Sequence, residues 1–329
     1  MKRIRRNQMA FLDIDLREQV SGKHELWDID KTINLRALSY RLKDMESTVG
    51  RHGYGLDVGL KCLFLQFLYD LSDRQLEKEL RFNIAYKWFC GFTAFEQTPD
   101  HSYFGRFRER IGTKRIGKIF KAIVNKAKEK HLIRGVFHFV DATSIVTKNT
   151  TWAERDKAIK DGEDALNNDN VKKYSADPQA RFGCKGKSKF WFGYKGHIGA
   201  DMGSGLIESA SLTPANISDQ AGFKSICPRD GQMVFGDKSY CLKPAQIVMK
   251  ARAAISAAIL KHNMIGKNKD LDRWRSSVRA PFEGVFSKCE KRARYRGQAK
   301  VQFQFFMDAI VHNVKRLVTI NSPPLFQGA

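Results

Sequence analysis

Apolar positions from residue 56 onward repeat with the period of amphipathic helices. The first such stretch carries apolar residues at intervals of three and four: Leu60, Leu63, Phe64, Phe67, Leu68 and Leu71. Residues spaced in this way share one face of a helix. Ser72, followed three residues later by Gln75, is a capping-box signature and predicts the start of a second helix.

Further helices are expected before residue 130. Aromatic residues predict a short helix around Tyr86, Trp88 and Phe89, which Gly91 ends. Two more are expected from Asp100 and from Thr113. With no strand pattern in this part, residues 1–131 are expected to form an all-α N-terminal domain. Its arginine-bearing helices suit a DNA groove, or they serve only packing and dimerisation; both interpretations stay open.

Near residue 132 the pattern changes to strands. Alternating or continuous apolar runs predict five of them, at 136–146, 190–200, 205–212, 232–235 and 255–260. Helices are expected at about 219–226, 243–253, 272–288 and 298–317. Three successive strands followed by alternating helices and strands predict a mixed five-stranded sheet with flanking helices. This order is the ribonuclease-H-like topology, in an α+β or α/β domain spanning 132–329.

The segment 148–189 interrupts that domain. It is polar and charged, and it shows no periodicity beyond a possible helix near 152–166. A long insertion of this kind in a compact domain is expected to be functional or mobile.

Two acids stand where folding disfavours them. Asp141 lies inside the apolar run VFHFVDATSIV, and Asp237 follows the apolar run that ends at Phe235. Strands disfavour Asp, and a buried carboxylate is costly unless it is paired or bound to a metal. In the expected topology the strands that carry these two residues are neighbours. A third acid, Glu283, lies in a helical segment rich in Arg and Lys.

Three carboxylates of this kind suit a two-metal site for phosphoryl transfer. Magnesium prefers oxygen ligands and keeps several waters, so we expect two Mg²⁺ ions, for which Mn²⁺ can substitute. Asp141 would bridge the ions, and Asp237 and Glu283 would complete their shells. Each acid also has a structural explanation by itself: an edge position for either aspartate, and an ion pair with Arg279 four residues earlier for Glu283.

Composition points to a polyanionic partner. Lys and Arg total 58 against 35 Asp and Glu, which gives a formal net charge of +23. Such an excess is typical of proteins that bind DNA, RNA or anionic membranes. No stretch of 18 apolar residues exists to span a membrane. The six cysteines form no CxxC pair, and no secretion signal is recognisable, so we expect reduced thiols, no zinc site and a cytosolic protein.

Six segments together resemble bacterial insertion-sequence transposases of the DDE type, most closely the insertion sequence five group. They are LYDLSDRQLEKELRFNIAYKWFCGF with TPDHSYFGRFRERIG, VDATSI, FGYKGHIGADMGSGLIESASLTPANISD, VFGDKSY and RAPFEGVFSKCEKRARYRGQAK. The resemblance covers almost the whole chain. It implies that Asp141, Asp237 and Glu283 are the catalytic, metal-binding triad, and that the protein is a cytoplasmic, nucleoid-associated protein of a bacterium.

The glutamate segment departs from a pattern common in such enzymes, Tyr-x2-Arg-x3-Glu-x6-Lys. Arg279 and Glu283 fit it, whereas Ser276 and Glu290 stand at the Tyr and Lys positions. Lys288 and Lys291 flank the Lys position and are expected to substitute.

The implied function is that of a DNA transposase. It would bind the terminal inverted repeats of its element, cleave there to leave a 3′-hydroxyl and join that hydroxyl to target DNA, as a homo-oligomer in the synaptic complex. The expected DNA-contacting residues are Lys195, His197, Lys238, Tyr240, Arg279, Lys288, Lys291, Arg292, Arg294 and Arg296. For Lys195 and His197, packing on the sheet face is an equal alternative. Two other functions stay open: a metal-dependent nuclease of the same fold, and a non-catalytic DNA-binding derivative of a transposase.

Overall fold

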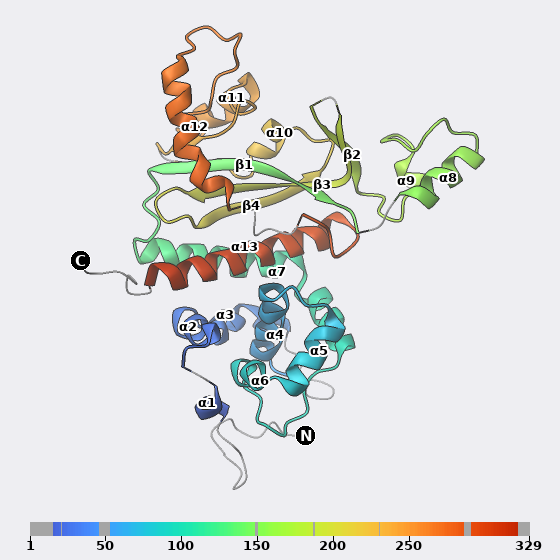
Figure 1. Cartoon of the computed structure of the whole chain (residues 1–329), viewed down its shortest axis with the longest axis vertical. Helices are drawn as coiled ribbons and strands as arrows, with labels where there is room; N and C mark the ends of the chain where they lie inside the picture. Colours follow the sequence, from blue (N-terminus) through green and yellow to red (C-terminus); the bar gives the residue numbers. More distant parts are fainter. Residues whose placement is uncertain are drawn as a thin grey trace. The chain divides into compact units, whose positions relative to one another are not determined.

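The structure is a computed structural model. It describes residues 16–20, 22–45, 53–148, 151–186, 188–229, 231–285 and 291–321. The chain divides into two compact units, one made of 1–122 with 314–329 and the other of 123–313 (Figure 1). The division falls inside two long helices, whereas the sequence pattern placed a domain boundary at the first strand.

Every element that the structure describes before residue 130 is helical. These elements are α1 (Leu16–Gln19), α2 (Glu25–Thr32), α3 (Leu35–Ser39), the 3-10 helix η1 (Tyr40–Met45), α4 (Leu56–Leu68), α5 (Asp73–Phe82), α6 (Ile84–Cys90) and α7 (His101–Glu129). The four helices from α4 onward follow the apolar pattern. No local pattern predicted the short helices before residue 50.

Local signals set the helix ends in the first unit. The capping box that opens α5 is present, because the Ser72 Oγ accepts from the Gln75 N–H and the Ser72 N–H donates to Gln75 Oε1 at 2.8 Å. Gly91 ends α6 in the left-handed region at φ 77°. Gly112, at φ 61°, breaks α7. The two helices expected from Asp100 and Thr113 therefore form one kinked element.

The second unit contains a six-stranded mixed sheet. Its strands are β1 (Phe137–Val146), β2 (Arg181–Lys185), β3 (Lys189–Asp201), β4 (Ile207–Pro214), β5 (Met233–Phe235) and β6 (Ile255–Ser256). Their order is β2-β3-β1-β5-β6, and β4 also pairs with β3. β1 pairs with β5 and β5 with β6 in parallel, whereas the pairs that β3 makes are antiparallel.

The prediction of a mixed sheet is confirmed. The strands expected at 136–146 and 232–235 are β1 and β5, and they are neighbours as predicted. The number of strands was wrong, because β2 lies within the polar insertion and pairs with β3. β2 is only five residues long and carries polar residues at both ends. Its strand conformation therefore comes from pairing with β3 and not from its own periodicity.

Helices cover both faces of the sheet. The helices after β1 are α8 (Trp152–Lys160) and α9 (Val171–Tyr174), which lie in the polar insertion, followed by α10 (Asp219–Phe223), α11 (Lys243–Ala251), α12 (Lys269–Glu283) and α13 (Gln298–Asn321). Val140 and Val234 pack into a buried cluster with Phe223 of α10 and Met249 of α11. The alternate residue of β1, Phe139, instead faces Phe282 of α12. Successive residues of a strand point to opposite faces, so α12 lies on the face that bears Asp141.

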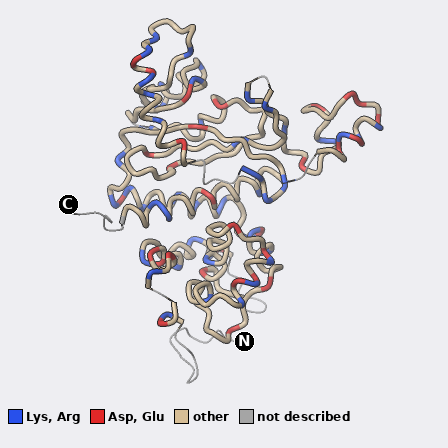
Figure 2. Tube along the Cα trace, viewed as in Figure 1, with Lys and Arg blue, Asp and Glu red and all other residues tan. Residues whose placement is uncertain are grey.

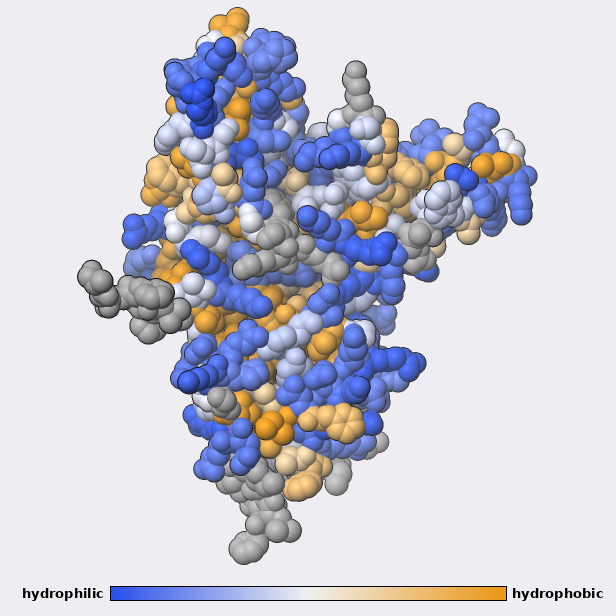
Figure 3. Space-filling view, viewed as in Figure 1, coloured by the Kyte–Doolittle hydropathy of each residue, from blue (hydrophilic) through white to orange (hydrophobic). Residues whose placement is uncertain are grey.

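The surface is strongly hydrophilic. Lys and Arg are spread over the traced chain, and hydrophilic residues dominate the face shown in space-filling view (Figures 2 and 3). Within the described ranges, no helix is long and apolar enough to cross a membrane.

Candidate active site

The register of two parallel strands brings Asp141 and Asp237 together. Phe139 of β1 pairs with Phe235 of β5. Each aspartate comes two residues after its phenylalanine: Asp141 lies further along β1, and Asp237 lies just beyond the end of β5. The two carboxylates are close enough for the charge of Asp237 to raise the pKa of Asp141. Strands that run parallel present their carboxyl ends at one edge of the sheet, which is the usual position of ligand sites in such sheets.

Asp141 is a largely buried carboxylate with a perturbed pKa. Its side chain is 26% exposed, and its Oδ1 accepts from the Ala142 N–H at 2.8 Å. Burial raises the pKa of Asp141 to about 6, and the neighbouring Asp237 adds to the increase. The Ala142 N–H and the charges of Arg279 and Lys185 oppose it. The carboxylate therefore lies in surroundings with too little positive charge to offset its burial.

Asp237 is oriented by a turn that the sequence analysis did not single out. The backbone N–H and the hydroxyl of Ser239 both donate to Asp237 Oδ1, at 2.8 and 2.6 Å. An aspartate that binds the backbone two residues ahead forms an Asx-turn. The Asp-x-Ser spacing was the available signal for this role of Ser239.

The last turn of α12 packs beside Asp141. Arg279 Nη2 lies 3.7 Å from Asp141 Oδ2, and the rings of Phe282 and Phe139 are 6.0 Å apart. Glu283, the next residue, is the last of this helix and is exposed. Among the residues that the structure describes, no three His, Cys, Asp or Glu side chains gather closely enough to hold a metal ion. The fold thus joins the two aspartates and leaves Glu283 on the adjoining helical turn.

Three expected DNA contacts have buried side chains. His197 and Tyr240 are fully buried, and Arg279 is only 7% exposed. His197 Nε2 lies 2.9 Å from Thr213 Oγ1, and burial lowers the pKa of its ring to about 4, so the ring is neutral. The burial of these three side chains does not fit a direct DNA contact. For His197 the structure shows the packing alternative.

The other expected contacts differ in accessibility. Lys195 donates to the carbonyl of Ile217 and pairs with Asp219 at 2.9 Å, so its ammonium is already satisfied within the fold. Lys238 is exposed next to Asp237. Lys288 lies outside the described residues.

The backbone of the segment 291–296 is anchored by hydrogen bonds at the end of β1. Arg292 forms a parallel bridge with Val146. The buried Gln304 of α13 accepts from the Arg294 N–H at 2.8 Å and donates to the Arg292 carbonyl at 3.0 Å. The backbone is therefore satisfied by the fold, whereas Lys291, Arg292 and Arg296 expose their side chains and Arg294 is partly buried.

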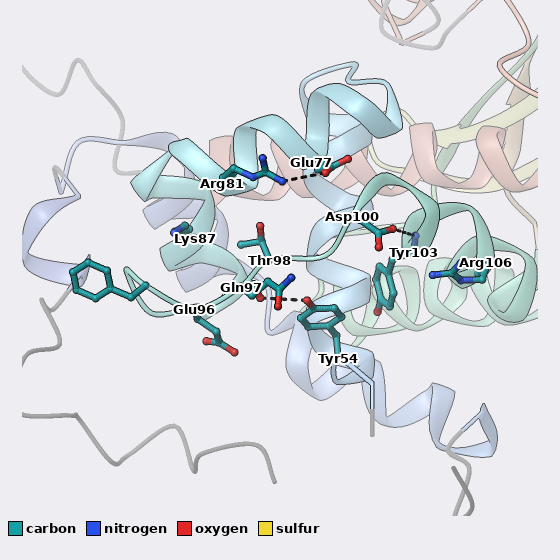
Figure 4. Close-up of a pocket in the computed structure, with 11 residues that line it drawn as sticks. Tyr54, Glu77, Arg81, Lys87, Glu96, Gln97, Thr98, Asp100, Tyr103 and Arg106 are labelled. Carbon is teal, nitrogen blue, oxygen red and sulfur yellow. Dashed lines mark hydrogen bonds and ion pairs between the residues drawn. The ribbon is translucent and has the colours of Figure 1, made fainter. Parts of the chain in front are cut away.

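A separate hollow of about 350 Å³ lies in the first unit (Figure 4). Its acids are already engaged within the fold. Glu77 binds Arg81 and His101, and Asp100 accepts from the Tyr103 N–H at the start of α7. The residues that line this hollow carry both positive and negative charges, and Glu77 and Asp100 are engaged within the fold. The hollow therefore does not resemble the site of Asp141 and Asp237.

Two family models match the chain. The transposase domain model DUF772 matches residues 14–110, and the transposase DDE domain model matches 135–314. The second match spans more than half of the chain and includes Asp141, Asp237 and Glu283. With its mixed sheet and its neighbouring aspartates on β1 and after β5, the fold is consistent with the class of DDE nucleotidyl-transfer enzymes. The chain belongs to the transposase DDE domain family. No solved structure matches it.

Proposed function

We propose that the chain is the DNA transposase of an insertion sequence of the insertion sequence five group. It would cleave DNA at the terminal inverted repeats of its element and join the 3′-hydroxyl to target DNA. The observation that carries the proposal is the parallel register of β1 and β5, which pairs Phe139 with Phe235 two residues before Asp141 and Asp237. The family matches across both parts of the chain support it.

The proposed architecture has two domains, one for each family match. Residues 132–329 would form a ribonuclease-H-like core, since the parallel β1–β5 pair lies between an antiparallel run and a further parallel strand. Residues 1–131 would form the helical domain that recognises the element ends. Because phosphate contacts position DNA without specifying sequence, end recognition is assigned to the helical domain and not to the basic segments of the core.

The aspartate pair fits a magnesium site. Its donors are hard carboxylate oxygens, and the raised pKa of Asp141 marks a deficit of positive charge that a divalent cation would relieve. Asp141, Asp237 and Glu283 would hold the Mg²⁺ ions, or Mn²⁺ in their place. When bound, such ions activate the attacking oxygen and stabilise the leaving oxygen of an in-line displacement at phosphorus.

The residues of the chain would orient the reactants. Ser239 fixes the carboxylate of Asp237, and Phe282 fixes the last turn of α12 against β1. The anchored basic segment, with Lys291, Arg292, Arg294 and Arg296, would bind backbone phosphates together with Lys238. Because the backbone of this segment is anchored, little ordering is required when DNA binds. The synapsis of two element ends implies a homo-oligomer.

A strand-joining assay tests the proposal. Labelled DNA carrying the element ends would be incubated with the full chain, Mg²⁺ and target DNA. We expect cleavage that leaves a 3′-hydroxyl, followed by joined product, and no reaction in EDTA. Cleavage without joining would favour the nuclease, and end binding with neither reaction would favour the non-catalytic derivative.

A further inference from the structure

Arg279 places a buried positive charge beside the proposed metal ligand. Its guanidinium lies 3.7 Å from Asp141 Oδ2 and 5.6 Å from the centre of the Phe139 ring. The buried Nε of Arg279 has no hydrogen-bond partner among the described residues. At this distance the contact with Asp141 is an ion pair without a good hydrogen bond. Arg279 is therefore held by charge and by the ring face, and not by bidentate hydrogen bonds.

The helix keeps this guanidinium in place. Phe282, in the same turn of α12, packs on the same Phe139 ring. A buried charge is costly without a partner, and the carboxylate of Asp141 supplies the opposite charge. Arg279 thus supplies positive charge to the Asp141 carboxylate. A metal ion bound to this carboxylate would have the same role.

We infer that Arg279 is a positioning residue that offsets part of the charge of Asp141 before the divalent ion binds, so that guanidinium and ion compete for this carboxylate. The inference rests on the proposed function, because it requires that Asp141 bind the metal. It differs from the DNA contact expected from the sequence, since the burial of Arg279 separates it from a surface phosphate. Competition follows because two cations that share one carboxylate repel each other at short range.

Metal binding to the full chain in the absence of DNA tests this inference. Mn²⁺ would be titrated by calorimetry at pH 8, which is above the pKa of about 6 of Asp141 in the parent. Arg279→Met removes the charge but keeps an unbranched apolar stem of similar length. We expect it to lower the Kd for Mn²⁺ by about tenfold or more, because a buried like charge is removed.

A matched control comes from the same helix. Arg273 is highly exposed and pairs with the equally exposed Asp270. Arg273→Met changes the net charge of the protein by the same amount, but it changes the electrostatic field at Asp141 far less. Its Kd for Mn²⁺ is therefore expected to stay within about twofold of that of the parent. Arg279→Lys keeps the charge and is expected to bind Mn²⁺ much more weakly than Arg279→Met. If the role of Arg279 were merely structural, Arg279→Met would bind Mn²⁺ more weakly than the parent, because loosening α12 would weaken metal binding.

The outcomes separate the two proposals. An unchanged or higher Kd in Arg279→Met, with normal binding by the parent, overturns the competition and leaves the metal site intact. Absence of Mn²⁺ binding in the parent and all variants overturns the metal site itself, and with it this inference. Should circular dichroism show that Arg279→Met does not fold, Arg279→Gln removes the same charge with a side chain that can still hydrogen-bond, and the same result is expected.

Discussion

Asp141 and Asp237 each stand two residues beyond a directly paired phenylalanine, Phe139 on β1 and Phe235 on the parallel strand β5. This relationship makes the two carboxylates neighbours although they are far apart in the sequence. Their proximity is felt electrostatically, since Asp237 is among the causes that raise the pKa of Asp141. Two like charges near one another are tolerated where a cation joins them.

Replacing Asp237 should change the titration of Asp141. Asp237→Asn removes the negative charge but keeps an oxygen that can accept from Ser239. The pKa of Asp141 is expected to fall below its present value of about 6 yet remain above its ordinary range, because burial is the larger cause. Carboxyl-carbon NMR of the metal-free chain measures it. An unchanged pKa would show that the two carboxylates do not interact.

Asp141 should also make the stability of the metal-free protein depend on pH. Its folded pKa of about 6 exceeds the ordinary value of 3.8, so between these values the folded chain keeps a proton that the unfolded chain has lost. Raising the pH through this window therefore destabilises the parent. Asp141→Asn has no such proton, so it should gain up to about 3 kcal/mol on the parent between pH 4 and pH 7.

Urea unfolding of both proteins at several pH values measures that difference. Asp270→Asn provides the control, because Asp270 is a highly exposed aspartate in the first turn of α12. The control should track the parent at each pH. A constant difference between Asp141→Asn and the parent would show that Asp141 titrates normally.

Glu283 is expected to be needed for chemistry and not for binding. A metal ligand lost from such a site lowers the rate by orders of magnitude, whereas loss of an exposed ion pair changes stability by at most about 1 kcal/mol. Glu283→Gln should fold, bind the element ends at least as well as the parent, and neither cleave nor join them. Binding and cleavage are to be measured on one preparation. Cleavage within about tenfold of the parent, a barrier change of about 1.4 kcal/mol, would remove Glu283 from the active site.

Gln304 should be required for the geometry of the basic segment. Gln304→Met keeps the volume but removes the two hydrogen bonds to the backbone of Arg292 and Arg294. We expect a stability loss of about 1–3 kcal/mol and weaker DNA binding, although no charge is lost. In contrast, Arg292→Gln should leave stability nearly unchanged and reduce the salt dependence of DNA binding by about one unit of slope. Unaltered DNA affinity in Gln304→Met would show that the segment needs no anchoring.

Much of the fold could be read from local patterns. The helices from α4 to α7, the capping box at Ser72 and the strands before Asp141 and Asp237 follow from side-chain periodicity and local hydrogen bonding. An aspartate at the end of an apolar strand is visible in the sequence because it opposes the preference of its own segment. Those two anomalies were sufficient to select the pair that the β1–β5 register brings together.

Other features depended on contacts between distant segments. β2 becomes a strand only by pairing with β3, and Arg279 is buried only because α12 packs on β1. No local pattern separates a buried arginine from the exposed arginines of the same helix, since burial is a property of the packed fold. The sequence by itself thus determined most helices and strands, and it singled out the two aspartates that strands disfavour. The tertiary structure decided which charges meet, because a strand register and a helix docking are set by burial of apolar faces across the whole unit.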